Sequence, residues 1–344
     1  MMEKIYPKFY TVDRCGYYKY NDKKNYLTNI SDILDDMQDW IKDKIIEKTL
    51  TTNKSNVKTQ RLIVYCLNVT KCDKHNTYLV TTWNKVETTD GNVLSIKINE
   101  PAETASKNVN TAKLPKNSIP GYATYSYIIP DDNILATVKF NHISNGHIGL
   151  NSYMNGFLTY YSKYVQTDKK SKTKDSAKIE VIGYGNSDTD FNTSLNPYFK
   201  SRLKKNKINT DKILANVNSI SKIIRKTTIS TDITAEKSLY GKLMEKLGTK
   251  ATKDNKEFQL KYEMKINPTK ENTQEIIKSW NKKDSWDDIG FQIKCEDNPV
   301  WLSADVHSQD LSISINRINS EFVDFNDLIA KLNNNLSKLR KSYK

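Results

Sequence analysis

The feature that most constrains the fold is a pair of strand–turn–strand signals. Residues 61–69 and 77–86 are rich in β-branched and aromatic side chains, and polar turn residues separate them. Residues 124–129 and 134–140 have the same character, with the sequence PDDN at 130–133 between them. Because Pro, Asp and Asn favour tight turns, each pair predicts two adjacent antiparallel strands.

Helical patterns accompany these hairpins. Residues 31–48 begin with Ser31 as an N-cap, have Asp in the first turn and Lys near the end, which predicts a helix. Residues 148–165 place Tyr and Phe at helical spacing, and we expect these rings in the core rather than stacked on bases. Further strands are expected at 179–185, 258–267, 289–295 and 311–318, and further helices at 235–247, 269–280 and 322–342. The class is therefore α+β, with mixed sheets, packed helices and two domains.

Positive charge is concentrated in one part of the chain. The net charge is +14, yet residues 151–226 hold 15 Lys or Arg against 6 Asp or Glu, whereas residues 227–344 hold 19 against 18. We therefore expect an N-terminal α+β domain at 1–165, a basic linker or insertion at 166–230, and a C-terminal α+β domain with a terminal basic helix at 231–344.

A clustered cationic surface is typical of a protein that binds a phosphate polyanion. The candidate DNA-binding residues fall into three groups: Lys200, Arg202, Lys204, Lys205 and Lys207; Arg225 and Lys226; and Lys338, Arg340, Lys341 and Lys344. After the first group, Ile213, Val217, Ile220, Ile223 and Ile224 predict a helix. Only six residues of the chain are Arg, so we expect contacts that position the DNA backbone rather than read bases.

Two other function classes fit parts of the sequence. A lysine-rich chain is also what AT-rich coding DNA produces, and such a chain can be a protein-interaction module whose lysines only solvate its surface. A nuclease is the second alternative, because Asp254, Glu263 and Lys265 have the residue types that hold Mg²⁺ and activate water. However, Lys261, Glu263 and Lys265 also form the polar face of an alternating strand, so we expect no catalytic residue.

The sequence lacks several motifs that mark catalytic, cofactor-binding or metal-binding sites. The sequence has no phosphate loop, no dinucleotide-binding glycine motif and no nucleophile elbow. Its four cysteines form no CxxC pair, so neither a zinc site nor any other metal or cofactor is predicted. With no apolar run of membrane-spanning length and no signal core, the expected location is the cytoplasm.

Four blocks in the same order resemble the RexA-type phage-exclusion family. They are the hairpin IPGYATYSYIIPDDNILATVKF with the helix after it, the turn RKTTISTDITAEKSLYGKLMEKLG, the strand KYEMKINPTK, and the basic terminal helix LNNNLSKLRKSYK. The resemblance covers roughly residues 60–170 and 220–344. It implies a homodimeric, sequence-nonspecific DNA binder, with a fold similar to the recombination-associated protein RdgC. It also implies a small RexB-like membrane channel partner in abortive infection.

The resemblance carries over to only a few residues. It assigns DNA contact to Arg225 and Lys226 in a turn, and to the basic residues of the terminal helix. The run Lys200–Lys212 lies in an insertion relative to the family, so its role depends on charge alone. Glu271 and Glu275 stand where the family is more basic, which argues against DNA contact by that helix.

Overall fold

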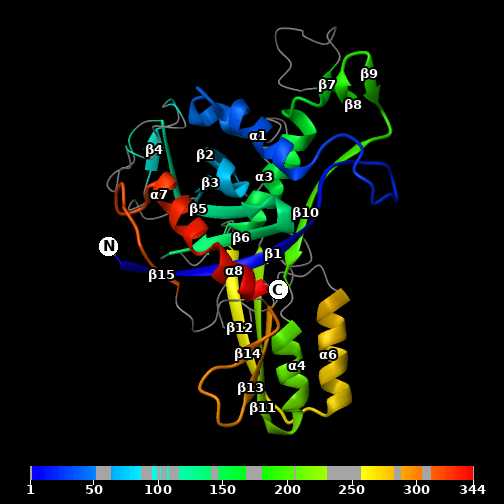
Figure 1. Ribbon diagram of the computed structural model, residues 1–344, viewed down its shortest axis with the longest axis vertical. Coiled ribbons are helices and arrows are strands. Elements are labelled where there is room, and N and C mark those ends of the chain that lie inside the picture. The colour runs from blue at the N-terminus through cyan, green and yellow to red at the C-terminus, as the bar shows by residue number, and fades with distance from the viewer. Residues whose placement is uncertain are drawn as a thin grey trace, which may run out of the picture. The chain divides into compact units, whose positions relative to one another are not determined.

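The computed structural model describes residues 2–51, 63–86, 95–97, 117–140, 146–167, 180–204, 207–230, 257–282, 288–303 and 311–343, together with 99, 101, 107 and 115. The fold is α+β, as predicted, and the chain divides into two compact units (Figure 1). The first unit comprises residues 1–7, 11–201 and 310–336, and the second comprises 8–10, 202–309 and 337–344. The domain boundaries expected at 165 and 230 stay a prediction.

An eight-stranded sheet has the order β10-β1-β6-β5-β3-β2, with β15 paired to β1 and β4 paired to β5. Its strands are β1 (Met2–Tyr18), β2 (Val64–Cys72), β3 (Thr77–Lys85), β4 (Ser95–Lys97), β5 (Ser118–Ile129), β6 (Ile134–Lys139), β10 (Asn196–Leu203) and β15 (Leu311–Ser314). The two predicted hairpins are confirmed, because β2 pairs with β3 and β5 pairs with β6, both antiparallel. The hairpins join side by side through β3 and β5.

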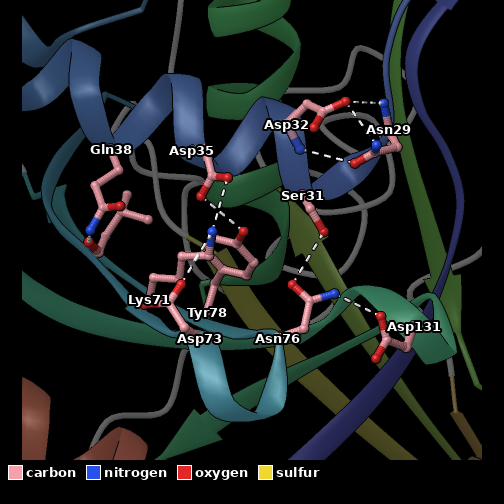
Figure 2. A network of polar contacts seen from close by, with 11 residues as sticks. Asn29, Ser31, Asp32, Asp35, Gln38, Lys71, Asp73, Asn76, Tyr78 and Asp131 are labelled. Carbon is pink, nitrogen blue, oxygen red and sulfur yellow. Dashed lines mark hydrogen bonds and ion pairs between the residues drawn. The ribbon is translucent and has the colours of Figure 1, made fainter.

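The turns of both hairpins have the same backbone structure. The short 3₁₀ helices η3 (Asp73–His75) and η4 (Pro130–Asp132) each end on an asparagine in the left-handed region, Asn76 at φ 45° and Asn133 at φ 51°. Asparagine tolerates this backbone conformation better than most residues. The Asn76 side-chain amide also donates to Asp131 Oδ1 at 2.7 Å, so the tips of the two hairpins are tied together (Figure 2).

Helices cover both faces of this sheet. Helices α1 (Ile30–Ile41) and α3 (His147–Tyr160) lie on one face, and α7 (Phe325–Asn334) lies on the other. Tyr78 donates its hydroxyl to Asp35 of α1, whereas Tyr127 donates to Asn333 of α7. These two tyrosines face opposite sides, because Leu79 and not Tyr78 is the cross-strand partner of Tyr127. Burial on both faces explains why β3 and β5 are nearly continuous runs of buried residues.

Helix α1 is shorter than the sequence pattern predicted. The N-cap is Asn29 rather than Ser31, because Asn29 Oδ1 accepts from the Asp32 N–H at 2.9 Å and Asp32 accepts in return, a capping box. The helix ends at Ile41, so the expected extension to residue 48 is wrong; Asp43 adopts φ 58° there. Asp35 and Gln38 dock α1 on β2, through an ion pair with Lys71 at 3.0 Å and a hydrogen bond to Val69 O at 2.8 Å (Figure 2).

Three strands of the large sheet, β1, β4 and β10, were not predicted. Strand β1 is 17 residues long and pairs antiparallel with β15, Met2 opposite Ser314. Arg317 donates from Nε and Nη2 to the two carboxylate oxygens of Glu3, both at 2.6 Å, and so fixes the start of β1. Strand β10 contains Lys200 and Arg202 of the first basic group and alternates buried and exposed residues from Phe199 to Leu203.

The second unit contains a four-stranded sheet of order β12-β11-β13-β14. Its elements are α4 (Lys207–Ala215), the 3₁₀ helix η6 (Val217–Ser219), β11 (Ile220–Ser230), β12 (Glu257–Lys265), α6 (Lys270–Lys282), β13 (Asp288–Ile293), β14 (Val300–Trp301) and α8 (Leu336–Tyr343). The helix expected to continue through Ile224 is therefore wrong. Ile220, Ile223 and Ile224 belong to β11 and pair with β13, which suits β-branched side chains.

The remaining elements are short. A three-stranded sheet holds β7 (Val165–Thr167), β8 (Val181–Ser187) and β9 (Asp190–Asn192), and η1 (Ile46–Thr49) is a 3₁₀ turn.

Helix α3 ends at Tyr160, not at 165, and Tyr153 and Phe157 are buried as expected. The terminal helix is split at Asn335. The predicted helix at 235–247 lies outside the described residues, as do residues 168–179 of the expected linker or insertion at 166–230. Within the described part of the chain, no helix is both long and apolar enough to cross a membrane.

Candidate nucleic-acid interface

Four lysines share one face of the sheet in the second unit. Lys222 and Lys226 are four residues apart on β11, so their side chains point to the same face. The antiparallel register places Lys265 opposite Lys222 and Lys261 opposite Lys226. Residues directly opposite in such a pair share a face. We call Lys222, Lys226, Lys261 and Lys265 the lysine face.

The lysine face contains two like-charge cross-strand pairs, an arrangement that destabilises a sheet by itself. One carboxylate moderates the repulsion: Glu263 contacts Lys222 Nζ at 2.8 Å and Lys261 Nζ at 3.0 Å. Hydrogen bonds from Lys222 and then Lys261 lower the pKa of Glu263, so this carboxylate stays ionised at neutral pH. The register also places the buried Asp288 of β13 opposite Lys226. The four lysines outnumber Glu263 and Asp288, the acids described beside them.

The buried ring of Trp301 lies beside these lysines. Trp301 of β14 pairs with Gly290 of β13, and Gly290 pairs with Ile224 between the two lysines of β11. A Cβ on Gly290 would come within 2.9 Å of the Trp301 ring, so glycine is what lets the indole lie across the sheet. The ammonium of Lys226 lies 3.7 Å from the centre of that ring, a cation–π contact that holds its position.

The structure separates two residues that the sequence had placed together. Arg225 and Lys226 were expected in one basic turn, but both lie within β11. Successive strand residues point to opposite faces. Arg225 therefore lies on the other face, where its guanidinium carbon is 6.0 Å from the centre of the Tyr262 ring. Of this predicted pair, only Lys226 belongs to the lysine face.

The other predicted basic residues lie on separate elements. Lys338 and Lys341 are exposed on α8, one turn apart, and Arg340 is half-buried beside them. Lys200 and Arg202 are exposed on β10, and Lys204 follows that strand with its N–H bonded to Phe9 O. Lys207 begins α4. Lys205 and Lys344 lie outside the described residues.

The residues of the alternative nuclease site do not form a metal-binding arrangement in the described part of the chain. Both carboxylate oxygens of Glu263 contact lysines, and Lys265 is exposed on the same strand face. Asp254 lies outside the described residues. Glu263 is thus held in an ion-pair network with Lys222 and Lys261.

Lys226 is the one member of the lysine face that the sequence predicted to bind DNA. Lys261 and Lys265 were expected only on the polar face of a strand or in the alternative nuclease site, and Lys222 was not predicted at all. The segment SKIIRK was read as helical because its isoleucines also fit helical spacing. Read with a period of two, the same segment places Lys222, Ile224 and Lys226 in one row. That period, in a run of β-branched residues, is the signal that could have revealed the face.

No protein-family model matches the sequence, and no curated protein sequence is significantly similar to it.

Proposed function

We propose that this chain is a sequence-nonspecific DNA-binding protein of a phage-exclusion system, and that the lysine face contacts the phosphate backbone. The observation that carries the proposal is the pair of opposed lysines, Lys222 with Lys265 and Lys226 with Lys261. Such pairs are unfavourable unless an anion lies between them. Glu263 contacts Lys222 and Lys261, and the buried Asp288 lies opposite Lys226, so the four lysines still outnumber these two acids.

Lysine chemistry supports backbone binding rather than base reading. An ammonium is a point charge on a flexible stem, which suits phosphate oxygens and carries no preference for a base edge. Trp301 fixes the position of Lys226, so less side-chain entropy is lost when this lysine binds an anion. A row of cations on paired strands can follow a phosphate backbone.

The biological setting is proposed from the sequence resemblance to the RexA-type family. In this setting the protein acts in the cytoplasm as a homodimer, without a catalytic centre or cofactor of its own. It binds phage replication or recombination DNA and signals to a RexB-like membrane channel in abortive infection. The basic terminal helix with Lys338, Arg340 and Lys341 supplies further backbone contacts.

The test compares two double variants of equal charge. Lys222→Gln with Lys226→Gln removes half of the lysine face, and Lys42→Gln with Lys48→Gln removes two exposed lysines of the first unit. Fluorescence anisotropy with a labelled 20-base-pair duplex should show binding roughly tenfold weaker at low salt for the first pair only. The slope of log K against log salt should also become less steep by about 2.

Equal losses from both pairs would mean that net charge alone attracts DNA and that the lysine face is no interface. Absence of duplex binding by the unmodified protein would reject the proposed function. Lys42 and Lys48 are exposed, whereas Lys222 and Lys226 are partly buried. Thermal unfolding midpoints of both double variants should therefore be compared with that of the unmodified protein to verify the fold.

A further inference from the structure

The first unit contains a polar cavity of about 520 Å³ that the lysine face does not involve. Its walls come from the end of β1, the loop that leads into α1, and the tips of the two hairpins. The lining includes Asp13, Arg14, Tyr18, Ser31, Asn76 and Asp131. Figure 2 shows one wall, where Ser31 of α1 faces Asn76 and Asn76 reaches Asp131. A cavity of this volume lies in the usual range for small-molecule sites.

Hydrogen bonds and a specific backbone conformation at Gly16 hold the walls of the cavity in place. Gly16 adopts φ 135°, and a Cβ there would come within 2.2 Å of the Asn25 side chain. Glycine lets the Asn25 amide donate to Cys15 O at 2.8 Å and accept from the Tyr17 N–H at 3.1 Å. The capping box at Asn29 and the Asn76–Asp131 hydrogen bond fix the opposite side. A preformed site loses little entropy when it binds a ligand.

A cation–aromatic cluster lies at this cavity. The Arg14 guanidinium carbon is 5.0 Å from the centre of the Tyr18 ring and 5.4 Å from that of Tyr198. Tyr18 is buried, whereas Tyr198 on β10 is 39% exposed. Lys200 is exposed two residues further along the same strand face, about 7 Å from Tyr198 between Cα atoms. An aromatic ring followed by a cation on one strand is the arrangement that holds a stacked base and the next phosphate.

The charges inside the cavity select against a phosphate. Two carboxylates, Asp13 and Asp131, accompany the single guanidinium of Arg14. Phosphate oxygens would be repelled by these acids, whereas a neutral heterocycle with both donors and acceptors matches them. Arg donates to base acceptors such as guanine O6 and N7, and a carboxylate accepts from base amino groups. The phosphate fits better outside, toward Lys200.

We propose that this cavity receives an unpaired nucleobase of single-stranded nucleic acid, with the neighbouring base stacked on Tyr198 and a phosphate at Lys200. The inference rests on the proposed function in that it takes nucleic acid as the ligand, and it adds a second site with a different specificity. Duplex DNA cannot use this site, because its bases are already stacked and paired.

The experiment uses three 20-mers: a single strand of mixed sequence, a base-free strand of equal charge, and a duplex. Tyr198→Ala should weaken binding of the single strand about tenfold, as expected for one lost stacking contact. The same change should leave the base-free strand and the duplex unaffected. Arg14→Lys keeps the charge but loses the planar guanidinium, so it should also weaken only the base-containing single strand. Tyr20→Ala, at an 81% exposed tyrosine just beyond β1, is the matched control.

Several outcomes would overturn this inference and not the proposed function. Equal affinity for the base-free and base-containing strands would show that no base is bound. An effect of Tyr198→Ala no larger than that of Tyr20→Ala would show that β10 is not the platform. In both cases duplex binding that depends on Lys222 and Lys226 would still support the proposed function. Failure of the protein to bind any of the three 20-mers would reject both.

Discussion

Glu263 controls how much positive charge the lysine face presents. Its carboxylate contacts both Lys222 and Lys261, and these contacts lower its pKa. We predict that Glu263→Gln strengthens duplex binding and makes the salt dependence steeper by about 1 for each lysine that becomes available to phosphate, hence by about 1 to 2. A pKa below the usual range keeps the native carboxylate charged from pH 8 down to pH 6, so the gain should be constant across that interval.

A variant of this residue also distinguishes the nuclease interpretation of the strand from the non-enzymatic one. A metal-dependent nuclease would lose Mg²⁺-dependent cleavage of supercoiled plasmid when Glu263 becomes Gln, because the metal would lose a ligand. Tighter binding without any cleavage in either protein is the result expected from the ion-pair network. Loss of cleavage in the variant would require the non-enzymatic assignment to be withdrawn.

At the scale of elements, Asn333 joins α7 to the large sheet. Its Oδ1 accepts from Thr77 Oγ1 at 2.9 Å and from the Tyr127 hydroxyl at 2.7 Å, and all three residues are buried. We predict that Asn333→Ala lowers the free energy of unfolding by about 2 kcal/mol, because buried hydroxyl groups lose an acceptor. Urea denaturation should measure this loss. Asn334→Ala, one residue later and exposed, should change stability by no more than about 0.5 kcal/mol.

Elements whose turns depend on neighbouring residues could be predicted from the sequence. The hairpin of β5 and β6 was predictable because Pro130 starts the turn and Asn133 takes the left-handed position. Strand β1 was not predictable, because its charged and aromatic residues alternate irregularly and its place depends on partners far along the chain. The helical prediction for β11 was wrong because Ile220, Ile223 and Ile224 fit helical spacing, although a run of β-branched residues also suits a strand. The lysine face follows from the register of two strands, which no single segment encodes.

At the scale of the whole molecule, electrostatics should determine how the protein binds duplex DNA. The net charge is +14, and the lysine face offers four cations to phosphates. Because Glu263 occupies Lys222 and Lys261, the lysine face should give log K a slope against log salt of between about −2 and −4, depending on how many of its lysines neutralise a phosphate. Titrations at several salt concentrations, on two duplexes of unrelated sequence, should give the same slope and nearly equal affinities. An affinity that does not change with salt would contradict backbone binding.

The pairing of β1 with β15 has a consequence for how the chain is made. Residues 2–5 form their hydrogen bonds with residues 311–314, and Glu3 finds its ionic partner in Arg317. During synthesis, therefore, the first strand leaves the ribosome long before its partner exists. Its edge remains open until translation passes residue 317, and contacts so distant in sequence form slowly. Synthesis that stops anywhere before that point would leave a chain whose first unit is incomplete and prone to aggregate.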